Sequence, residues 1–414
     1  MNPGVCPPGA EVDVVIVGGG PAGLTLALAL VRADASLLGR LVVLERGTYP
    51  RDKYCAGAIG WRGEKILSEL GAVPDVPSVP VSGMSYRGAH GEQAQRAGRI
   101  GRVIRRMEFD HALARIALDR GISVIERAAA ERVEVESDGA IVTTARGAYK
   151  GRIVVGADGV GSVVRKAMGL GSGQLRAQVL ELDTEPTRGD RARDLLHFDA
   201  GDASFAGYFW DFPTCVDGRE LVCRGVYHLY EGAPHAAGQS EVDIRERFAA
   251  RLSAMGLDID RYKNKRFAER GLHGEELLST GRLLLAGEAA GIDPVTGEGI
   301  AQAIEYGALA APFLADVLAR KRSLEQWTDA VRRSRLGTDL RIRRRIVHAF
   351  FGRSRSAVDR LLVASPAVVR SGGRHFGALP QDALDLVEIG LETKGVFLES
   401  LKRRLRGALH LDSS

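Results

Sequence analysis

The stretch Asp13–Gly23, DVVIVGGGPAG, decides the fold of this 414-residue chain. Its first five residues are mostly β-branched and apolar, which is typical of a strand buried in a parallel sheet. The glycines follow at once, and Pro21–Arg32 is rich in Ala and Leu, which predicts a helix. A second apolar run, Leu41–Leu44, ends at Glu45 and predicts another buried strand. Together these segments predict a βαβ unit with a right-handed crossover.

Gly18, Gly20 and Gly23 form a GxGxxG pattern between the predicted strand and helix. The first glycine permits a tight turn, the second lets the backbone approach a pyrophosphate, and the third lets helix and strand pack closely. Free N–H groups and the helix dipole favour phosphate at the helix N-terminus. Glu45 comes 22 residues after Gly23, at a strand end where a carboxylate accepts hydrogen bonds from ribose hydroxyls. The sequence therefore predicts a dinucleotide site.

Two later segments distinguish FAD from NAD. Ile153–Ser162, IVVGADGVGS, resembles the GADG segment of the p-hydroxybenzoate hydroxylase-like flavoproteins, and Arg282–Ile300, RLLLAGEAAGIDPVTGEGI, resembles their second flavin motif. In that superfamily a strand end supplies an acid to the ribityl chain, and a helix N-terminus points at the isoalloxazine. Glu288 stands where Asp is usual. The side chain of Glu is one methylene longer, so it reaches a ribityl hydroxyl if the backbone lies further from the flavin. The alternative is a weaker affinity for the flavin.

Three further segments resemble the geranylgeranyl reductase-like branch of this superfamily. Lys53–Ile59 (KYCAGAI) is similar to a loop that lies near the flavin in that branch. Gly207–Pro213 (GYFWDFP) is similar to its substrate-domain motif, and Val103–Asp110 (VIRRMEFD) to the start of its helix after the crossover. The branch contains prenyl-chain reductases and hydroxylases, and its distant relatives include halogenases.

The resemblance implies two groups of site residues. Cys55, Tyr208, Trp210 and Pro294 are the predicted catalytic residues, with Pro294 near the reactive edge of the flavin. Cys55 has a structural alternative as a small buried hydrophobe, and the alternating aromatic residues of the substrate domain have one as core packing. The predicted cofactor-binding residues are Gly18, Gly20, Ala22, Gly23, Glu45, Arg46, Cys55, Ala56, Gly57, Arg106, Asp158, Gly159, Gly287, Glu288, Pro294, Gly297, Gly299 and Ile300.

The length of the chain and its pattern of predicted strands and helices indicate an α/β protein with more than one domain, because 414 residues are too many for one small core. We predict a Rossmann-type FAD-binding domain of three layers (ββα), an antiparallel-sheet substrate domain and a helical C-terminal region. Breaks in that last region are expected near Pro366, Gly372 and Pro380. The predicted boundaries are 1–85, 99–174 and 274–330 for the FAD-binding domain, 86–98 and 175–273 for the substrate domain, and 331–414 for the C-terminal region.

The first expectation for the reaction is a flavin monooxygenase. Reduced flavin would form a hydroperoxide with O2 and transfer one oxygen to an aromatic or lipophilic substrate, in a dry pocket that needs no catalytic dyad. The alternative is reduction of prenyl-chain double bonds, for which Cys55 and the wall of Tyr208 and Trp210 are better matched. Halogenation or hydroxylation of a protein side chain comes third, and a flavin-binding structural protein is the non-enzymatic alternative. NAD(P)H is the expected reductant and would meet the flavin transiently, because no second GxGxxG is present.

Charge and composition restrict the partners. The net charge is +5, and the hydrophobic and charged fractions of 45% and 26% are typical of a globular protein. Seven arginines between Arg332 and Arg345 predict a solvated helix face, with an acidic carrier protein or an anionic membrane surface as alternative partners. No nucleic-acid-binding module surrounds them, and no apolar run approaches the roughly 18 residues that span a bilayer. The four cysteines have no metal-ligand spacing, so no metal site is predicted and a reduced cytoplasm is expected.

Overall fold

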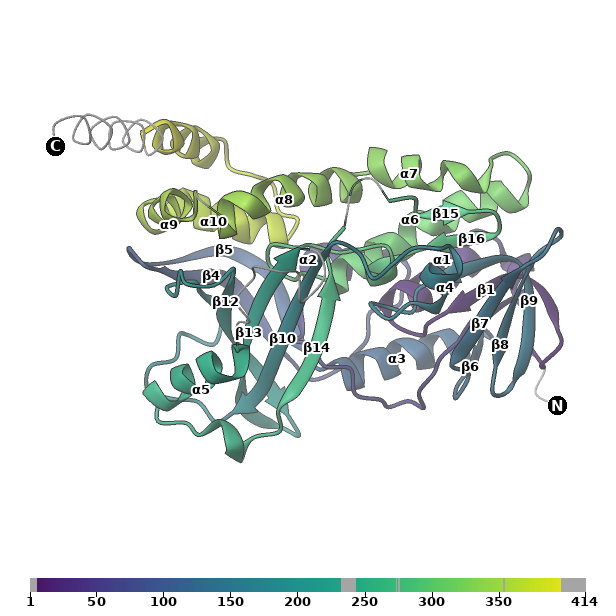
Figure 1. Ribbon diagram of the computed structural model, residues 1–414, viewed down its shortest axis with the longest axis horizontal. Helices are drawn as coiled ribbons and strands as arrows, with labels where there is room; N and C mark the ends of the chain where they lie inside the picture. Colours follow the sequence, from purple (N-terminus) through teal and green to yellow (C-terminus); the bar gives the residue numbers. More distant parts are fainter. Residues whose placement is uncertain (1–5, 232–242, 273, 275, 353, 396–414) are drawn as a thin grey trace.

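The computed structural model describes residues 6–231, 243–272, 274, 276–352 and 354–395. The parts of the predicted domains that fall in 1–5, 232–242 and 396–414 lie outside these ranges. Two eight-stranded sheets lie next to each other, and the C-terminal helices run along one side of the second sheet (Figure 1). The chain therefore has the predicted α/β fold, with a Rossmann-type region, a largely antiparallel sheet and a helical C-terminal region.

The first sheet contains the predicted βαβ unit. Its order is β15-β16-β9-β1-β2-β6, and β7 and β8 continue from β9 as antiparallel strands. β1 pairs in parallel with both β2 and β9, which explains why its residues from Val14 to Ile16 are fully buried. The strands are β1 (Glu11–Val17), β2 (Leu41–Leu44), β6 (Ser123–Ile125), β7 (Ala130–Val135), β8 (Ala140–Thr144), β9 (Gly147–Gly156), β15 (Ser279–Thr280) and β16 (Leu283–Leu285).

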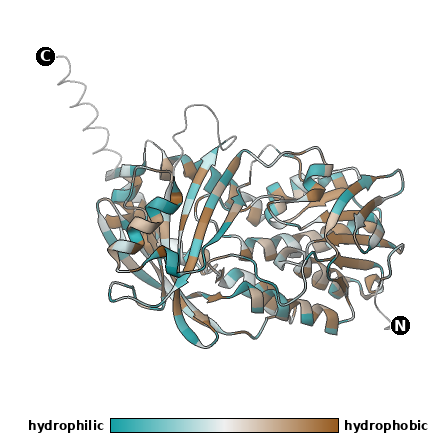
Figure 2. Cartoon of the chain, turned by 60° about the horizontal axis from the view of Figure 1, so that its bottom comes forward, coloured by the Kyte–Doolittle hydropathy of each residue, from teal (hydrophilic) through white to brown (hydrophobic). Residues whose placement is uncertain are grey.

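Helices α1 (Pro21–Ala33), α3 (Arg106–Asp119) and α6 (Ile300–Leu318) pack around this sheet. α1 and α6 approach closely, because a Cβ at Gly307 of α6 would lie 2.6 Å from the carbonyl oxygen of Ala22. Figure 2 shows the strands of this region mostly in brown, as expected for a sheet covered on both faces. The close contact between α1 and α6 brings the two glycine-rich segments of the sequence together.

The second sheet has the order β14-β10-β13-β12-β11-β4-β5-β3. We expected only residues 86–98 of the segment before α3 to belong to it, but β4 and β5 pair there over their whole lengths. The apolar residues of these two strands alternate with Ser, Gly and Arg, so the sequence contains no apolar run that marks them. The domain boundaries themselves remain a prediction. The strands are β3 (Ala58–Gly60), β4 (Ser78–Gly88), β5 (Gly91–Ile104), β10 (Leu175–Thr184), β11 (Leu195–Asp199), β12 (Gly207–Val216), β13 (Arg219–Glu231) and β14 (Lys265–Arg270).

The two faces of the second sheet are covered differently. Helix α5 (Ile244–Ala254) packs on one face through Phe248, which stacks on Phe209 of β12. On the other face, α9 and α10 contact β4 and β5 (Figure 1). The remaining helices are α2 (Trp61–Glu69), α4 (Val163–Ala167), α7 (Trp327–Arg333), α8 (Arg335–Phe351), α9 (Arg355–Ala364) and α10 (Pro366–Phe376).

The C-terminal region is helical, with one difference from the prediction. Pro366 is the first residue of α10, where the missing N–H of proline breaks no helical hydrogen bond, but Gly372 lies inside α10 and not at a break. The helix continues because it packs against β5, with Gly373 close to Ala97. A further helical stretch covers 383–395. Within the described residues, no helix is long and apolar enough to cross a bilayer.

Candidate active site

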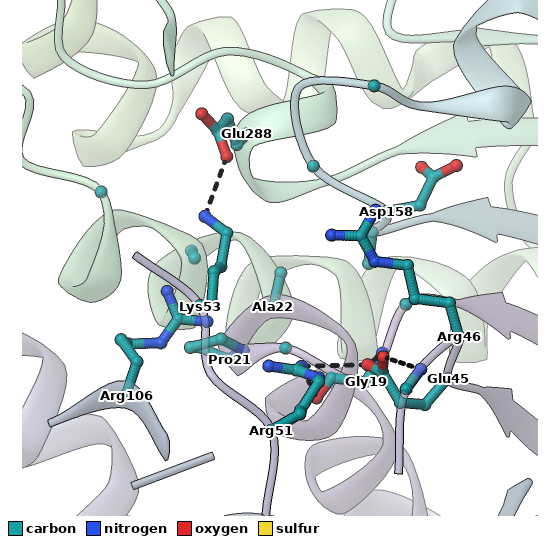
Figure 3. Close-up of a pocket in the computed structure, with 18 of the residues that line it drawn as sticks. Gly19, Pro21, Ala22, Glu45, Arg46, Arg51, Lys53, Arg106, Asp158 and Glu288 are labelled. Carbon is teal, nitrogen blue, oxygen red and sulfur yellow. Dashed lines mark hydrogen bonds and ion pairs between the residues drawn. The ribbon is translucent and has the colours of Figure 1, made fainter. Parts of the chain in front are cut away.

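A cavity of about 500 Å³ lies where the two glycine-rich segments meet. The turn after β1 and the residues before α6 line it from opposite sides, as Figure 3 shows for Gly19 and Glu288. Gly18 has a φ of 111°, and a Cβ there would overlap Ala157, so only glycine suits this turn. Gly20 is different, since a Cβ there would meet only Arg106 Nη2, at 3.7 Å. This glycine leaves open space in front of α1.

Two helix N-termini border this cavity without a side-chain cap. α1 begins after Gly20, and α6 begins after Gly299, and neither N-cap residue supplies a side-chain hydrogen bond. The first N–H groups of a helix have no partner within the helix, and the helix dipole adds positive potential there. The cavity therefore suits a ligand that carries negative charge near the N-terminus of α1 and near that of α6. A pyrophosphate at α1 and an electron-rich ring system at α6 fit this arrangement.

Glu45, at the end of β2, is held by three partners. Its Oε2 accepts hydrogen bonds from Gly19 N at 3.1 Å and Arg51 Nη2 at 2.9 Å, and its Oε1 accepts one from Gly47 N at 2.8 Å (Figure 3). Arg46, the next residue, also lines the cavity. Glu45 therefore has a fixed orientation at the end of the cavity where the sequence predicts ribose binding.

A chain of charges links Glu45 to α3. Arg51 Nη1 donates to Asp110 Oδ2 at 2.9 Å, and Arg106 makes a two-pronged hydrogen bond to the same carboxylate at 2.7 Å. Asp110 is fully buried, and Arg106 and Arg51 lower its pKa against the effect of burial. Our prediction included Arg106 but missed Arg51 and Asp110. Asp110 stood in the VIRRMEFD segment as a signal, whereas nothing in the sequence marked Arg51.

Two acids lie on the opposite side of the cavity. Asp158 Oδ2 accepts from Val163 N at 2.7 Å, whereas its Oδ1 is buried without a hydrogen-bond partner in the described part of the chain. Glu288 Oε2 lies 3.3 Å from Lys53 Nζ, which reaches across the cavity (Figure 3). The free Asp158 oxygen and the accessible Glu288 carboxylate suit a ligand that carries hydroxyl groups, such as the ribityl chain of FAD.

A second cavity of about 550 Å³ joins the first. Cys55, Phe267, Glu269, Gly297, Gly299 and Ile300 line both. From this junction the second cavity extends between the second sheet and the helices α8 to α10, and most of its lining is apolar. Tyr208, Trp210 and Phe212 of β12 lie on its wall, whereas Phe209 points to α5 on the opposite face. The alternating aromatic residues thus line a cavity and belong to a core cluster at the same time.

The aromatic wall is held by backbone contacts. The hydroxyl of Tyr208 donates to Thr296 O at 2.7 Å, and that of Tyr227 donates to Pro294 O at 3.0 Å. The two rings stack with centroids 5.1 Å apart. Trp210 differs, because its Nε1 is buried and has no hydrogen-bond partner within the described residues. The two tyrosines therefore position the loop before α6, whereas the Trp210 N–H holds no part of the described chain.

Cys55 lies at the junction on a loop that β10 holds in place. Its N–H donates to Glu181 Oε1 at 2.9 Å, and its Sγ accepts from Gly57 N at 3.5 Å. Burial raises the pKa of the Cys55 thiol, so it is protonated and is not a thiolate nucleophile. Burial also raises the pKa of Glu181 to about 7. Glu181 was not predicted, and its place on a strand of the other sheet left no signal in the sequence.

The predicted site residues fall into three groups. Ala56, Gly57, Tyr208 and Trp210 line only the second cavity. Gly23, Gly287 and Pro294 line neither: a Cβ at Gly287 would lie 2.8 Å from that of Ala22, and Pro294 is buried, with its carbonyl oxygen bound by Tyr227. Pro294 was expected to face the flavin edge, but the chain turns so that Val295 and Gly297 face the cavities instead. The third group contains the predicted residues that line the first cavity: Gly18, Gly20, Ala22, Glu45, Arg46, Cys55, Arg106, Asp158, Gly159, Glu288, Gly297, Gly299 and Ile300.

A Rossmann-type sheet, two uncapped helix ends at one cavity and an apolar cavity beside it define an FAD-dependent oxidoreductase. The chain belongs to the FAD-binding domain family, which it matches over residues 11–336. Among the described residues, no group of three or more His, Cys, Asp or Glu side chains is placed to hold a metal ion.

Known proteins similar to this chain are named for different reactions. The 6-methylpretetramide 4-monooxygenase of Streptomyces rimosus is 27% identical over 351 residues, which cover 78% of this chain and 80% of that protein. Digeranylgeranylglycerophospholipid reductase 3 of Methanosphaera stadtmanae is 24% identical over 347 residues, covering 78% of this chain and 82% of that protein. The solved structure of a flavoprotein/dehydrogenase from Cytophaga hutchinsonii is 15% identical, has a TM-score of 0.72, and shares its fold over 94% of this chain and 100% of that one. These similarities confirm the superfamily and its geranylgeranyl reductase-like branch.

Proposed function

We propose that this enzyme reduces double bonds in an elongated, lipophilic substrate of the prenyl type. The observation that carries the proposal is the second cavity, which opens at the junction and runs beneath three helices. Its volume of about 550 Å³ suits a small-molecule ligand. A prenyl chain has no polar atoms along its length, so apolar contact area supplies its binding energy. This reverses the order of the two reactions that the sequence alone suggested.

The charged groups that line this cavity support the same substrate. Asp339, Arg343 and Glu298 are paired with one another or with close neighbours, and Arg355 donates to backbone carbonyl groups such as Ala200 O at 2.8 Å. Paired charges bind protein and not ligand, so the cavity beyond Glu269 at the junction presents a mainly apolar interior. Bound FAD, once reduced, supplies the hydride for such a reaction. NAD(P)H is the proposed source of the electrons.

Anaerobic single-turnover oxidation tests this proposal. The FAD-loaded enzyme is reduced with one equivalent of NADPH or dithionite and mixed with geranylgeraniol, and its fully saturated analogue serves as the control. The proposal expects the oxidised-flavin absorbance to return with geranylgeraniol only, together with a product of higher hydrogen content. No return of absorbance with either alcohol would refute it.

A monooxygenase is the second candidate, and the free Nε1 of Trp210 favours it. An unpaired N–H in an apolar wall is costly unless a ligand accepts its hydrogen bond, and a phenol or ketone oxygen would do so. The same preparation distinguishes the two candidates. NADPH oxidation that requires O2, increases with an aromatic substrate and yields a hydroxylated product would identify the monooxygenase.

A further inference from the structure

Glu269, on β14, lies at the junction of the two cavities and lines both. Its carboxyl group faces the loop before α6, since a Cβ at Gly297 would lie 2.6 Å from Glu269 Oε2. Gly297 has a φ of 66°, so glycine suits this position both for its backbone and for the space it leaves. A ligand that passes from one cavity to the other therefore passes the Glu269 carboxyl.

Glu269 has no protein partner for its charge. Its Oε2 is buried without a hydrogen bond, and no ion pair to Glu269 occurs in the described part of the chain. The hydroxyl groups nearby are occupied, because Tyr208 and Tyr227 donate to backbone carbonyl oxygens. The Glu269 side chain is half-buried, and a carboxyl oxygen that is buried without a partner is costly unless a ligand supplies one.

The surroundings of Glu269 favour the protonated form of its carboxyl group. Burial raises its pKa well above the usual value, and the neighbouring acids Glu288, Asp293 and Glu181 raise it further, against the opposing effect of Lys53. A carboxylic acid that stays neutral at neutral pH can donate a proton. The Cys55 thiol is the other acidic group at the junction. A thiol is a weaker acid than a carboxyl group, and burial raises the pKa of Cys55 further, so it is the poorer proton donor.

We propose that the Glu269 carboxyl donates the proton that completes reduction of the substrate double bond. This inference rests on the proposed function. The π bond of the alkene breaks, one carbon forms a C–H bond with the hydride that reduced FAD supplies, and the other forms a C–H bond with the proton from Glu269. The alkene is reduced, FAD is oxidised, and the Glu269 carboxylate then takes a proton from water.

The test compares Glu269→Gln with Glu220→Gln, an exposed residue at the start of β13 that is remote from both cavities. Glutamine keeps the size of the side chain but cannot transfer its protons. In anaerobic single turnover with geranylgeraniol, Glu269→Gln is expected to slow flavin reoxidation by about 100-fold or more, which is typical for loss of a general acid. Glu220→Gln is expected to stay within a fewfold of the wild type.

A second measurement does not depend on turnover. The infrared spectrum of the FAD-loaded protein at neutral pH is expected to contain a carbonyl band of a protonated carboxyl group that Glu269→Gln removes and Glu220→Gln retains. FAD content and thermal unfolding show whether the variants are folded and loaded.

The outcomes are distinct. The inference is supported if the wild type reacts, the FAD-loaded Glu269→Gln variant does not, and this variant lacks the infrared band of the protonated carboxyl group. If the wild type and a loaded Glu269→Gln react equally, Glu269 is not the donor and the proposed function stands. If the wild type does not react with geranylgeraniol, the proposed function fails and this inference fails with it.

Discussion

The Nη2 atom of Arg343, on α8, lies 3.2 Å from Oε2 of Glu298, in the loop before α6. Arg343 also pairs with Asp293 in the same loop and, through Nε at 3.4 Å, with Asp339 on its own helix. The side chains of Arg343 and Glu298 are only 11% and 3% exposed. This network ties the C-terminal helices to the loop that faces both cavities. The arginine-rich segment is thus not uniformly the solvated face we predicted, because acids of the loop bury one of its members.

Replacing Arg343 with Gln is expected to destabilise the protein strongly. Asp293 would remain buried without its cationic partner, and Glu298 would keep Arg62 at 3.6 Å; breaking such a buried pair typically costs about 3–5 kcal/mol. Denaturant unfolding of the FAD-free protein measures this change. Arg341→Gln is the matched control, because Arg341 lies on the exposed side of the same helix. Equal stability of the two variants would contradict the structural role of Arg343.

Alanine at Gly18 and at Gly20 is expected to have different effects. At Gly18 the new Cβ would overlap Ala157 and occupy a left-handed conformation, so folding stability should fall by about 1–3 kcal/mol or more. At Gly20 the Cβ fits the protein but fills the space in front of α1, so the variant should fold and bind FAD at least about tenfold more weakly. Thermal unfolding and FAD titration measure the two effects, with Gly189→Ala, which has open space, as the control. Unchanged FAD affinity in Gly20→Ala would argue against a pyrophosphate at this turn.

Stability is expected to depend on pH through Glu181. The pKa of Glu181 is about 7 in the folded protein, above its ordinary value of 4.5. Its contribution to stability is therefore complete below about pH 4.5 and is lost as the pH rises through 7. From pH 5 to pH 8 the wild type should lose on the order of 2–3 kcal/mol that Glu181→Gln does not lose. Unfolding free energies measured across this range, with exposed Glu131→Gln as the control, test the sign; parallel curves for wild type and Glu181→Gln would refute it.

Alanine at Gly225 is expected to impair substrate binding selectively. A Cβ at Gly225, on β13, would overlap the indole ring of Trp210, so the ring must move into the second cavity. Affinity for geranylgeraniol should fall at least about tenfold, whereas FAD affinity should stay unchanged because the first cavity is not touched. Fluorescence titrations measure both constants, and Gly171→Ala, with nothing near its Cβ, is the control. A parallel loss of FAD affinity would show that the effect is not local.

The sequence by itself determined the Rossmann-type core and the FAD class, and it predicted most of the residues that line the first cavity. These features depend on short stretches of sequence. A strand, a glycine turn and a helix N-terminus, such as those around Gly18–Gly23, are each determined by a few consecutive residues. It also placed Tyr208 and Trp210 on one strand face, since side chains alternate along a strand.

Only the tertiary structure decided which charged residues lie at the junction or contact its loops. Glu269, Glu181 and Arg343 come from strands and a helix far apart in the sequence, and a charged residue on a strand or helix is ordinarily a solvent-facing one. Whether these residues are buried, and whether they have a charged partner, depends on how the second sheet and the C-terminal helices pack against the loop before α6. The same packing turned Pro294 away from the cavities, because the direction of a loop residue depends on its contacts and not on its motif.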